Sequence, residues 1–246
     1  MNMKKIKQTL INLPNKSKLA ASLLKFVNIF RPKKKIINQA SHAENVFNLI
    51  NSLSVPVIPF FGTLLSIYRE KNITYADDFD FATTNTNVFT SDFIEEIENK
   101  GAALIAVSVV DKELVELTFD LNGAKIDIFY LDSDDEYYIH RCPNFRKERA
   151  QKEFTLIEKS IYTSYFQVKY PIFGLKKDDF SKLSIPDNCP EIFIRHYGND
   201  WMIPKKNNFI DFKSYEFINK ESYTAFGCSE NIKKHLLDNN LLREFR

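Results

Sequence analysis

The sequence predicts an α+β fold in which a mixed sheet is flanked by helices. Apolar residues recur at helical spacing over 37–53 and again over 91–100. Three apolar or alternating segments read as strands: 103–110, 113–121 and 124–130. Asn122-Gly123, between the last two of them, is a strong hairpin-turn signal. Helical and strand patterns along one chain favour a sheet with helices packed on it.

The other elements are predicted from local signals of the same kind. Pro56 and Pro59 end the first helix, and the apolar residues around them read as a short buried strand that leads to Gly62. Thr63 is placed to cap a helix that runs to about Glu70. Four later elements are expected: a strand over 79–82, helix with irregular structure over 140–159, a strand over 164–174, and a short helix over 190–198 that ends at Gly198.

The composition is that of a folded protein with a sizeable core. The chain has 246 residues, of which 44% are apolar and 14% aromatic, enough for one large domain or two small ones. The formal net charge is +2, so the overall field does not favour nucleic acid as a partner. Only 6 residues are glycine, and the sequence contains no Gly-rich phosphate loop of the Walker or dinucleotide type. Phosphate recognition must therefore use a single glycine turn, side-chain cations or a metal.

The cysteines and the hydropathy indicate a cytoplasmic setting. Cys142, Cys189 and Cys228 are widely separated, and their spacing fits neither a zinc site nor a disulfide framework. Such cysteine usage suits a reducing compartment. No apolar run approaches the ~20 residues of a membrane-spanning helix, and the basic N-terminus lacks the unbroken apolar core of a signal peptide.

Residues 1–36 differ from residues 37–246, which we expect to form a single catalytic domain with a C-terminal extension. The first segment contains ten Lys and Arg and no Asp or Glu, and its apolar residues predict a basic amphipathic helix. One interpretation is a helix packed on its own domain. The other is a peripheral anchor on anionic membrane, where each basic residue contributes roughly 1 kcal/mol. The sequence leaves both interpretations open.

An acidic pattern predicts a metal site. Asp78 and Asp80 are two residues apart and alternate with apolar residues, so on a strand both carboxylates point to the same face. Asp127 in the segment KIDIFY alternates with apolar residues in the same way. Like charges held this close repel, and hard carboxylate oxygens are ligands that Mg²⁺ or Mn²⁺ accepts. An isolated pair of acids is more often only solvated than part of a metal site. A glycine turn, an acid pair and a third acid on separate elements indicate a metal-phosphate site more specifically.

Three blocks of the sequence resemble the family that includes bacterial phosphorylcholine transferases of the LicD type and the animal fukutins. The first block matches in order at Gly62, Thr63, Leu64, Leu65, Arg69, Tyr75, Asp77, Asp78 and Asp80. The second is the strand that carries Asp127, and the third is IPDNCPEIFIRHYGNDWMIP. Tyr75 stands where the family often has Trp, and Ala76 where it often has another acid.

The resemblance implies a nucleotidyltransferase-like mixed sheet flanked by helices, with an N-terminal helical segment and C-terminal helical additions. It implies an enzyme that moves a phospho-alcohol, such as phosphocholine, phosphoglycerol or phosphoribitol, from a CDP-activated donor. The acceptor would be a hydroxyl of a cell-surface glycan, often one that is lipid-linked at the cytoplasmic face of the membrane. Mg²⁺ or Mn²⁺ would be the cofactor.

The predicted site residues have the following roles. Asp78 and Asp80 hold the metal, and Asp127 either completes its shell or accepts the proton of the acceptor hydroxyl. Backbone N–H groups after Gly62 and the Thr63 hydroxyl would contact phosphate. Arg69 and Lys71 would either clamp a phosphate of the substrate or form structural ion pairs. Tyr75 and Tyr197 would either line the substrate site or pack in the core. Trp201, the only Trp, would shape the acceptor pocket or pack.

Two other function classes stay open. A nucleotidyltransferase that adds a nucleoside monophosphate to a small molecule or RNA would use the same metal-binding carboxylates. An RNA substrate would need a basic, aromatic-lined groove, and no such groove is evident outside residues 1–36. A non-catalytic glycan-binding module with a decayed site is the other class, although the acids of the pattern are intact.

Overall fold

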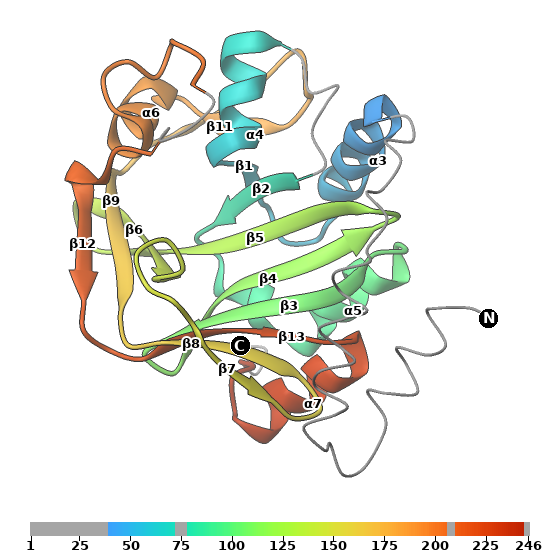
Figure 1. The fold of residues 1–246 in the computed structure, drawn as a ribbon. Coiled ribbons are helices and arrows are strands. Elements are labelled where there is room, and N and C mark those ends of the chain that lie inside the picture. The colour runs from blue at the N-terminus through green and yellow to red at the C-terminus, as the bar shows by residue number, and fades with distance from the viewer. Residues whose placement is uncertain (1–38, 72–77, 206–209, 244–246) are drawn as a thin grey trace. The chain divides into compact units, whose positions relative to one another are not determined.

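The computed structural model describes residues 39–71, 78–205 and 210–243, all of which belong to one compact unit, Gln39–Arg246 (Figure 1). The predicted basic segment 1–36 lies outside the described residues, as do Tyr75 and Asp77. No helix in the described part of the chain is long and apolar enough to cross a membrane.

Eleven strands form one curled sheet in the described residues. Their order is β12-β9-β6-β5-β4-β3-β13-β8-β7, while β2 pairs with β5 and β1 pairs with β2. The strands are β1 Ile58–Pro59, β2 Asp78–Thr83, β3 Ala103–Val110, β4 Glu113–Leu121, β5 Ala124–Ser133, β6 Tyr137–Pro143, β7 Gln151–Phe154, β8 Glu158–Tyr162, β9 Tyr165–Pro171, β12 Tyr215–Ile218 and β13 Ser222–Phe226. A separate hairpin contains β10 Leu175–Lys177 and β11 Ser184–Pro186. Between β5 and β6 the sheet turns sharply, so that β9 and β12 run across the direction of β3 and β4 (Figure 1).

Within the part of the chain that the structure describes, the helices are short and few relative to the strands. They are α3 Gln39–Asn51, α4 Phe61–Leu65, the π-helix η1 Ser66–Glu70, η2 Thr86–Phe89, α5 Ser91–Asn99, α6 Cys189–Tyr197, η3 Phe212–Ser214 and α7 Ser229–Asp238. Helices α3, α5 and α7 contribute to one apolar core with the central strands, whereas α4 and α6 belong to a second core with β6 and β9.

The predicted fold class is wrong. The protein is mostly β, and among the described strands β2–β5 is the one parallel pair in an otherwise antiparallel sheet. The expected helix over 140–159 is absent from the structure. That region instead forms the second half of β6, all of β7 and the start of β8. The expected helical additions at the C-terminus contain β12 and β13 as well as α7. Over 140–159, β6 pairs with β9 and β7 pairs with the neighbouring β8, and this strand pairing overrides the local helical and charged pattern.

Several local predictions are confirmed. Helices α3 and α5 lie where the helical spacing placed them, and Gly101 follows α5 with a φ of 94°. Asn122 and Gly123 join β4 to β5 with positive φ values of 54° and 100°, the conformation of a tight hairpin turn. Strand β9 and helix α6 also form, and α6 ends at Gly198.

The first core explains the direction of the acidic side chains. Alternate residues of β2 and β5 enter this core beneath α3, among them Phe79, Phe81, Ile126 and Ile128, all fully buried. Because successive side chains of a strand point to opposite faces, the residues between them face the other side of the sheet. Asp80 and Asp127 are two of these residues.

Candidate metal centre

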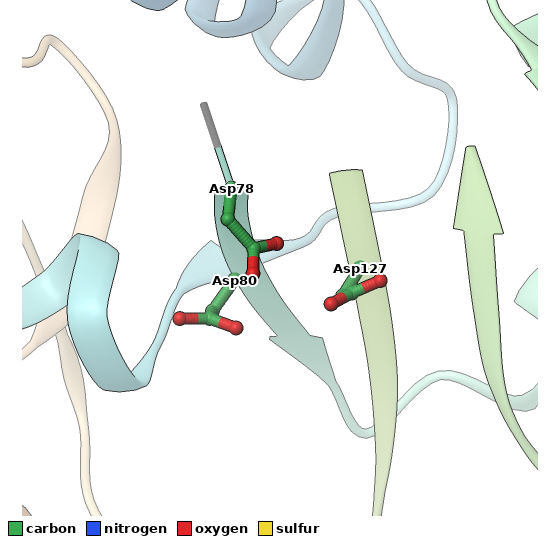
Figure 2. A group of neighbouring side chains, drawn as sticks. All are labelled: Asp78, Asp80 and Asp127. Atoms are coloured by element: carbon green, nitrogen blue, oxygen red, sulfur yellow. The ribbon is translucent and has the colours of Figure 1, made fainter. Parts of the chain in front are cut away.

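Asp80 and Asp127 are directly opposite each other in the register of β2 and β5. Asp78 lies two residues before Asp80 on the same strand, so it shares the same face. Figure 2 shows Asp78 and Asp80 on one strand and Asp127 on its neighbour. One carboxylate oxygen of each residue lies within 4.8 Å of the others. The structure therefore brings together three acids that are up to 49 positions apart in the chain.

The surroundings of the three acids fit a hard divalent cation. Asp78 is exposed, Asp80 is partly buried, and Asp127 is only 4% exposed. The Oδ1 atom of Asp127 is buried and has no hydrogen-bond partner among the described residues. A buried carboxylate oxygen without a partner is costly, and an all-oxygen set of ligands suits Mg²⁺ or Mn²⁺. This combination of convergence and an unpartnered oxygen makes the cluster a candidate metal centre.

The Gly-Thr turn holds Asp80 in place. The Gly62 N–H donates to Asp80 Oδ2 at 3.0 Å, and the Asp80 N–H donates to Thr63 Oγ1 at 2.8 Å. A Cβ atom at Gly62 would lie 3.2 Å from the same Asp80 oxygen, so the turn is closely fitted to the carboxylate. Thr63 was expected as a helix cap, but it is buried within α4, which begins at Phe61. Its hydroxyl fixes the neighbouring strand instead of the end of a helix.

The electrostatics favour a cation at this position. Burial, followed by the charges of Asp127 and Asp78, raises the pKa of Asp80 to about 7. Burial also raises the pKa of Asp127, although Lys125 opposes this shift. Both carboxyl groups are therefore harder to ionise than ordinary aspartates, and a divalent cation would relieve the repulsion between them.

Lys125 is a site residue that the sequence analysis missed. Its Nζ donates to Asp127 Oδ2 at 2.5 Å and to Asp78 Oδ1 at 3.2 Å, so it connects β5 to β2. Burial lowers the pKa of this ammonium group, but the carboxylates of Asp127 and Asp78 outweigh burial and raise it overall. The available signal was its position two residues before Asp127, which places both on one face of a strand.

Glu116 is a fourth carboxyl group on the same face. Thr118 on β4 lies opposite Asp127, and Glu116 is two residues from Thr118. The Ser108 hydroxyl on β3 donates to Glu116 Oε2 at 2.5 Å. Burial, and next the charge of Asp127, raises the pKa of Glu116 to about 8. Two signals for Glu116 were available in the sequence: its alternation with Val115 and Leu117, and the Asn122-Gly123 hairpin, which pairs its strand with that of Asp127.

Arg69 and Lys71 bind partners outside the acid cluster. Arg69 donates to the Trp201 carbonyl oxygen at 3.0 Å and pairs with Glu70 at 2.5 Å. Lys71 pairs with Asp178 at 3.3 Å. Among the described residues, these contacts favour the ion-pair interpretation for both side chains over a phosphate clamp.

The third block of the resemblance lies beside the cluster. Tyr197 at the end of α6 is buried, and its pKa is raised by burial first and then by the charge of Asp80, while Arg69 opposes the shift. The charges of Asp80 and Arg69 therefore both act on the Tyr197 hydroxyl. Trp201 packs against Phe193 and Tyr68, with ring centroids 4.8 Å and 5.9 Å apart. The Trp201 side chain thus makes packing contacts, while its carbonyl oxygen accepts from Arg69.

Comparison with known proteins gives only a weak and partial similarity. No protein-family model matches the chain. The chain is similar to the serine-aspartate repeat-containing protein E of Staphylococcus aureus strains MSSA476, USA300 and Newman, each 25% identical over 170 residues. The matched region covers 59% of this chain, and the chain spans 15% of the length of those relatives.

Proposed function

We propose that the protein is a metal-dependent phosphotransferase that moves a phospho-alcohol from a CDP-activated donor to a glycan hydroxyl. The observation that supports this proposal is the convergence of Asp78, Asp80 and Asp127 within 4.8 Å, with one buried Asp127 oxygen that has no hydrogen-bond partner among the described residues. The acid cluster supports phosphate chemistry in general. The resemblance to the LicD and fukutin family narrows the donor to a CDP-alcohol.

In this proposal, Asp78, Asp80 and Asp127 would hold Mg²⁺ or Mn²⁺. When bound, the cation would neutralise the donor diphosphate and the departing nucleoside monophosphate. Gly62 and Thr63 keep Asp80 oriented through their hydrogen bonds. Because these bonds come from a helix packed in the second core, the carboxylate is held before the substrate arrives.

The acceptor hydroxyl needs a group that takes its proton as its oxygen attacks phosphorus. With Asp127 assigned to the metal, Glu116 is the carboxyl group on the same face that we assign to this task. Glu116 is partly exposed and is oriented by Ser108, and burial and the charge of Asp127 raise its pKa, so that it takes up a proton more readily than an ordinary glutamate. The products would be the glycan that carries the phospho-alcohol on its hydroxyl oxygen, and CMP.

The test is a product analysis with a panel of CDP-alcohols, a short glycan acceptor, and either Mg²⁺ or EDTA. We expect metal- and acceptor-dependent release of CMP by the wild type, and its loss in Asp78→Asn. Asp111→Asn is a matched control, because Asp111 is an exposed aspartate that pairs with Lys220. Nucleoside monophosphate attached to the acceptor would indicate the nucleotidyltransferase class instead. Glycan binding without turnover would indicate a binding module.

We also propose that residues 1–36 hold the enzyme peripherally at the cytoplasmic face of a membrane. The support is the ten basic residues of this segment, with apolar residues at helical spacing between them. Lipid-linked acceptors would then meet the enzyme at a raised local concentration.

A further inference from the structure

The ammonium group of Lys125 joins two acids from neighbouring strands. It contacts Asp127 Oδ2 on β5 and Asp78 Oδ1 on β2, at 2.5 Å and 3.2 Å. These two residues also belong to the set whose oxygens converge as a possible metal site. The positive charge of Lys125 therefore acts on the same carboxylates that a divalent cation would use.

A lysine and a divalent cation compete for such a site. Two positive charges a few ångströms apart repel each other, and the repulsion is stronger near a buried group than in bulk water. Asp127 is 4% exposed, so this effect applies to at least one of the shared ligands. A cation on the unpartnered Asp127 Oδ1 would still be repelled by the ammonium group on Oδ2 of the same carboxylate, so metal binding favours movement of Lys125 away from Asp127.

The Lys125 side chain has room to move. It is 44% exposed, and its aliphatic stem starts from a position on β5 beside Asp78 in the register. Lysine carries a compact charge on a flexible stem, so it can exchange one anionic partner for another without moving the strand. When a cation neutralises Asp78 and Asp127, an anion that approaches the cation is the natural new partner for the ammonium group.

We infer that Lys125 is an internal counter-cation that holds Asp78 and Asp127 together in the metal-free protein and binds a phosphate of the donor once a divalent cation is bound. The phosphate half of this inference rests on the proposed function. Lys125 then contacts the donor phosphate directly, and the metal binds before the nucleotide. In the metal-free protein, the lysine offsets the repulsion between the surrounding acids.

The experiment is calorimetric titration of Mn²⁺ alone into the metal-free full-length protein, followed by titration of CDP into the Mn²⁺-loaded protein. Lys125→Met removes the charge and keeps most of the stem. Lys220→Met is the matched control, because Lys220 also pairs with an aspartate, Asp111, through exposed side chains. Lys125→Gln is a second variant in case Lys125→Met does not fold.

We expect Lys125→Met to bind Mn²⁺ about tenfold more tightly than the wild type, because the competing charge is gone, a difference of about 1.4 kcal/mol. The same variant should bind CDP about tenfold more weakly. Lys220→Met should change neither constant. Equal or weaker Mn²⁺ binding by both Lys125 variants would overturn the counter-cation role.

The outcomes separate this inference from the proposed function. Tighter Mn²⁺ binding with unchanged CDP binding would overturn the phosphate half and leave the counter-cation half supported. Absence of Mn²⁺ binding by the wild type and by both variants would overturn the inference together with the metal centre. If all variants behave as expected but no CDP-alcohol is turned over, the inference stands and the proposed reaction fails.

Discussion

Asp80 on β2 and Asp127 on β5 lie directly opposite each other in the one parallel strand pair of the described sheet. Parallel pairing requires β2 and β5 to be brought together from separate parts of the chain, with β3 and β4 between them in sequence. In this register both carboxylates point away from the apolar core, on the face that also carries Asp78. The acid cluster therefore depends on the parallel pairing of β2 with β5 as well as on the spacing of the acids in the sequence.

Asp127→Asn should abolish metal-dependent transfer, by roughly a hundredfold or more, because it removes a charged ligand from the centre. The variant should nevertheless fold. Its unfolding midpoint in EDTA should equal or exceed that of the wild type, because the amide removes a buried charge that repels Asp80. Urea unfolding with EDTA and transfer assays with Mg²⁺ measure the two effects. A large loss of stability with unchanged transfer would contradict this account.

Thr63→Val should destabilise the protein by about 1–2 kcal/mol, because the Asp80 N–H loses its hydrogen-bond acceptor next to a buried core. Valine has nearly the shape of threonine, so packing is preserved. Thr84→Val is the control, since Thr84 is exposed. Urea denaturation of both variants provides the comparison, and equal stability would show that the hydroxyl does not fix β2.

The stabilisation by Mg²⁺ should increase with pH. The pKa values of Asp80 and Glu116 are about 7 and about 8 in the folded protein, whereas unfolded carboxyl groups titrate near pH 4. Between these limits the folded state binds protons that the unfolded state has released, so the free energy of unfolding of the metal-free protein falls as pH rises.

A bound cation favours the ionised acids and competes with their protons. The increase in melting temperature with saturating Mg²⁺ should therefore be larger at pH 8 than at pH 5.5. Thermal unfolding with Mg²⁺ or EDTA across this range checks the trend. An increase that is the same at both pH values would mean that these carboxyl groups are not linked to metal binding.

Residues 1–36 should bind vesicles that contain anionic lipid, and the binding should weaken as salt rises, because surface attraction is screened over ~8 Å at physiological salt. Vesicle flotation measures this for the full chain and for a deletion of residues 1–36. The deletion should release the protein from vesicles and retain activity on a short soluble acceptor. If the full chain ignores anionic vesicles at low salt, or if the deletion unfolds the rest, the segment has a structural role instead.

Local patterns predicted the strands that carry the acids. Phe79 and Phe81 alternate with Asp80, and Ile126 and Ile128 flank Asp127, so burial of one face directs the carboxylates to the other. The Asn122-Gly123 turn was also predictable, because few residues other than Asn, Asp and Gly adopt positive φ at both turn positions.

The topology and the partners of the acids were not predictable in this way. Over 140–159 the charged residues suggested helix and irregular structure, but most of β7 lies exposed at the edge of the sheet, where charge is compatible with a strand. Lys125 joins the site through the pairing of β5 with β2, which is distant in sequence, whereas Glu116 reaches it through the β4–β5 hairpin. The β2–β5 contact depends on which strands become neighbours, and no local pattern specifies that choice.

The central claim is that Asp78, Asp80 and Asp127 form a metal centre. The most direct test is anomalous diffraction at the manganese edge from crystals of the protein grown with Mn²⁺, compared with crystals of Asp127→Asn grown in the same way. This account predicts an anomalous peak within bonding distance of all three carboxylates in the wild type and its loss in the variant. A wild-type map without a peak at this position, with Lys125 still bound to Asp78 and Asp127, would contradict it.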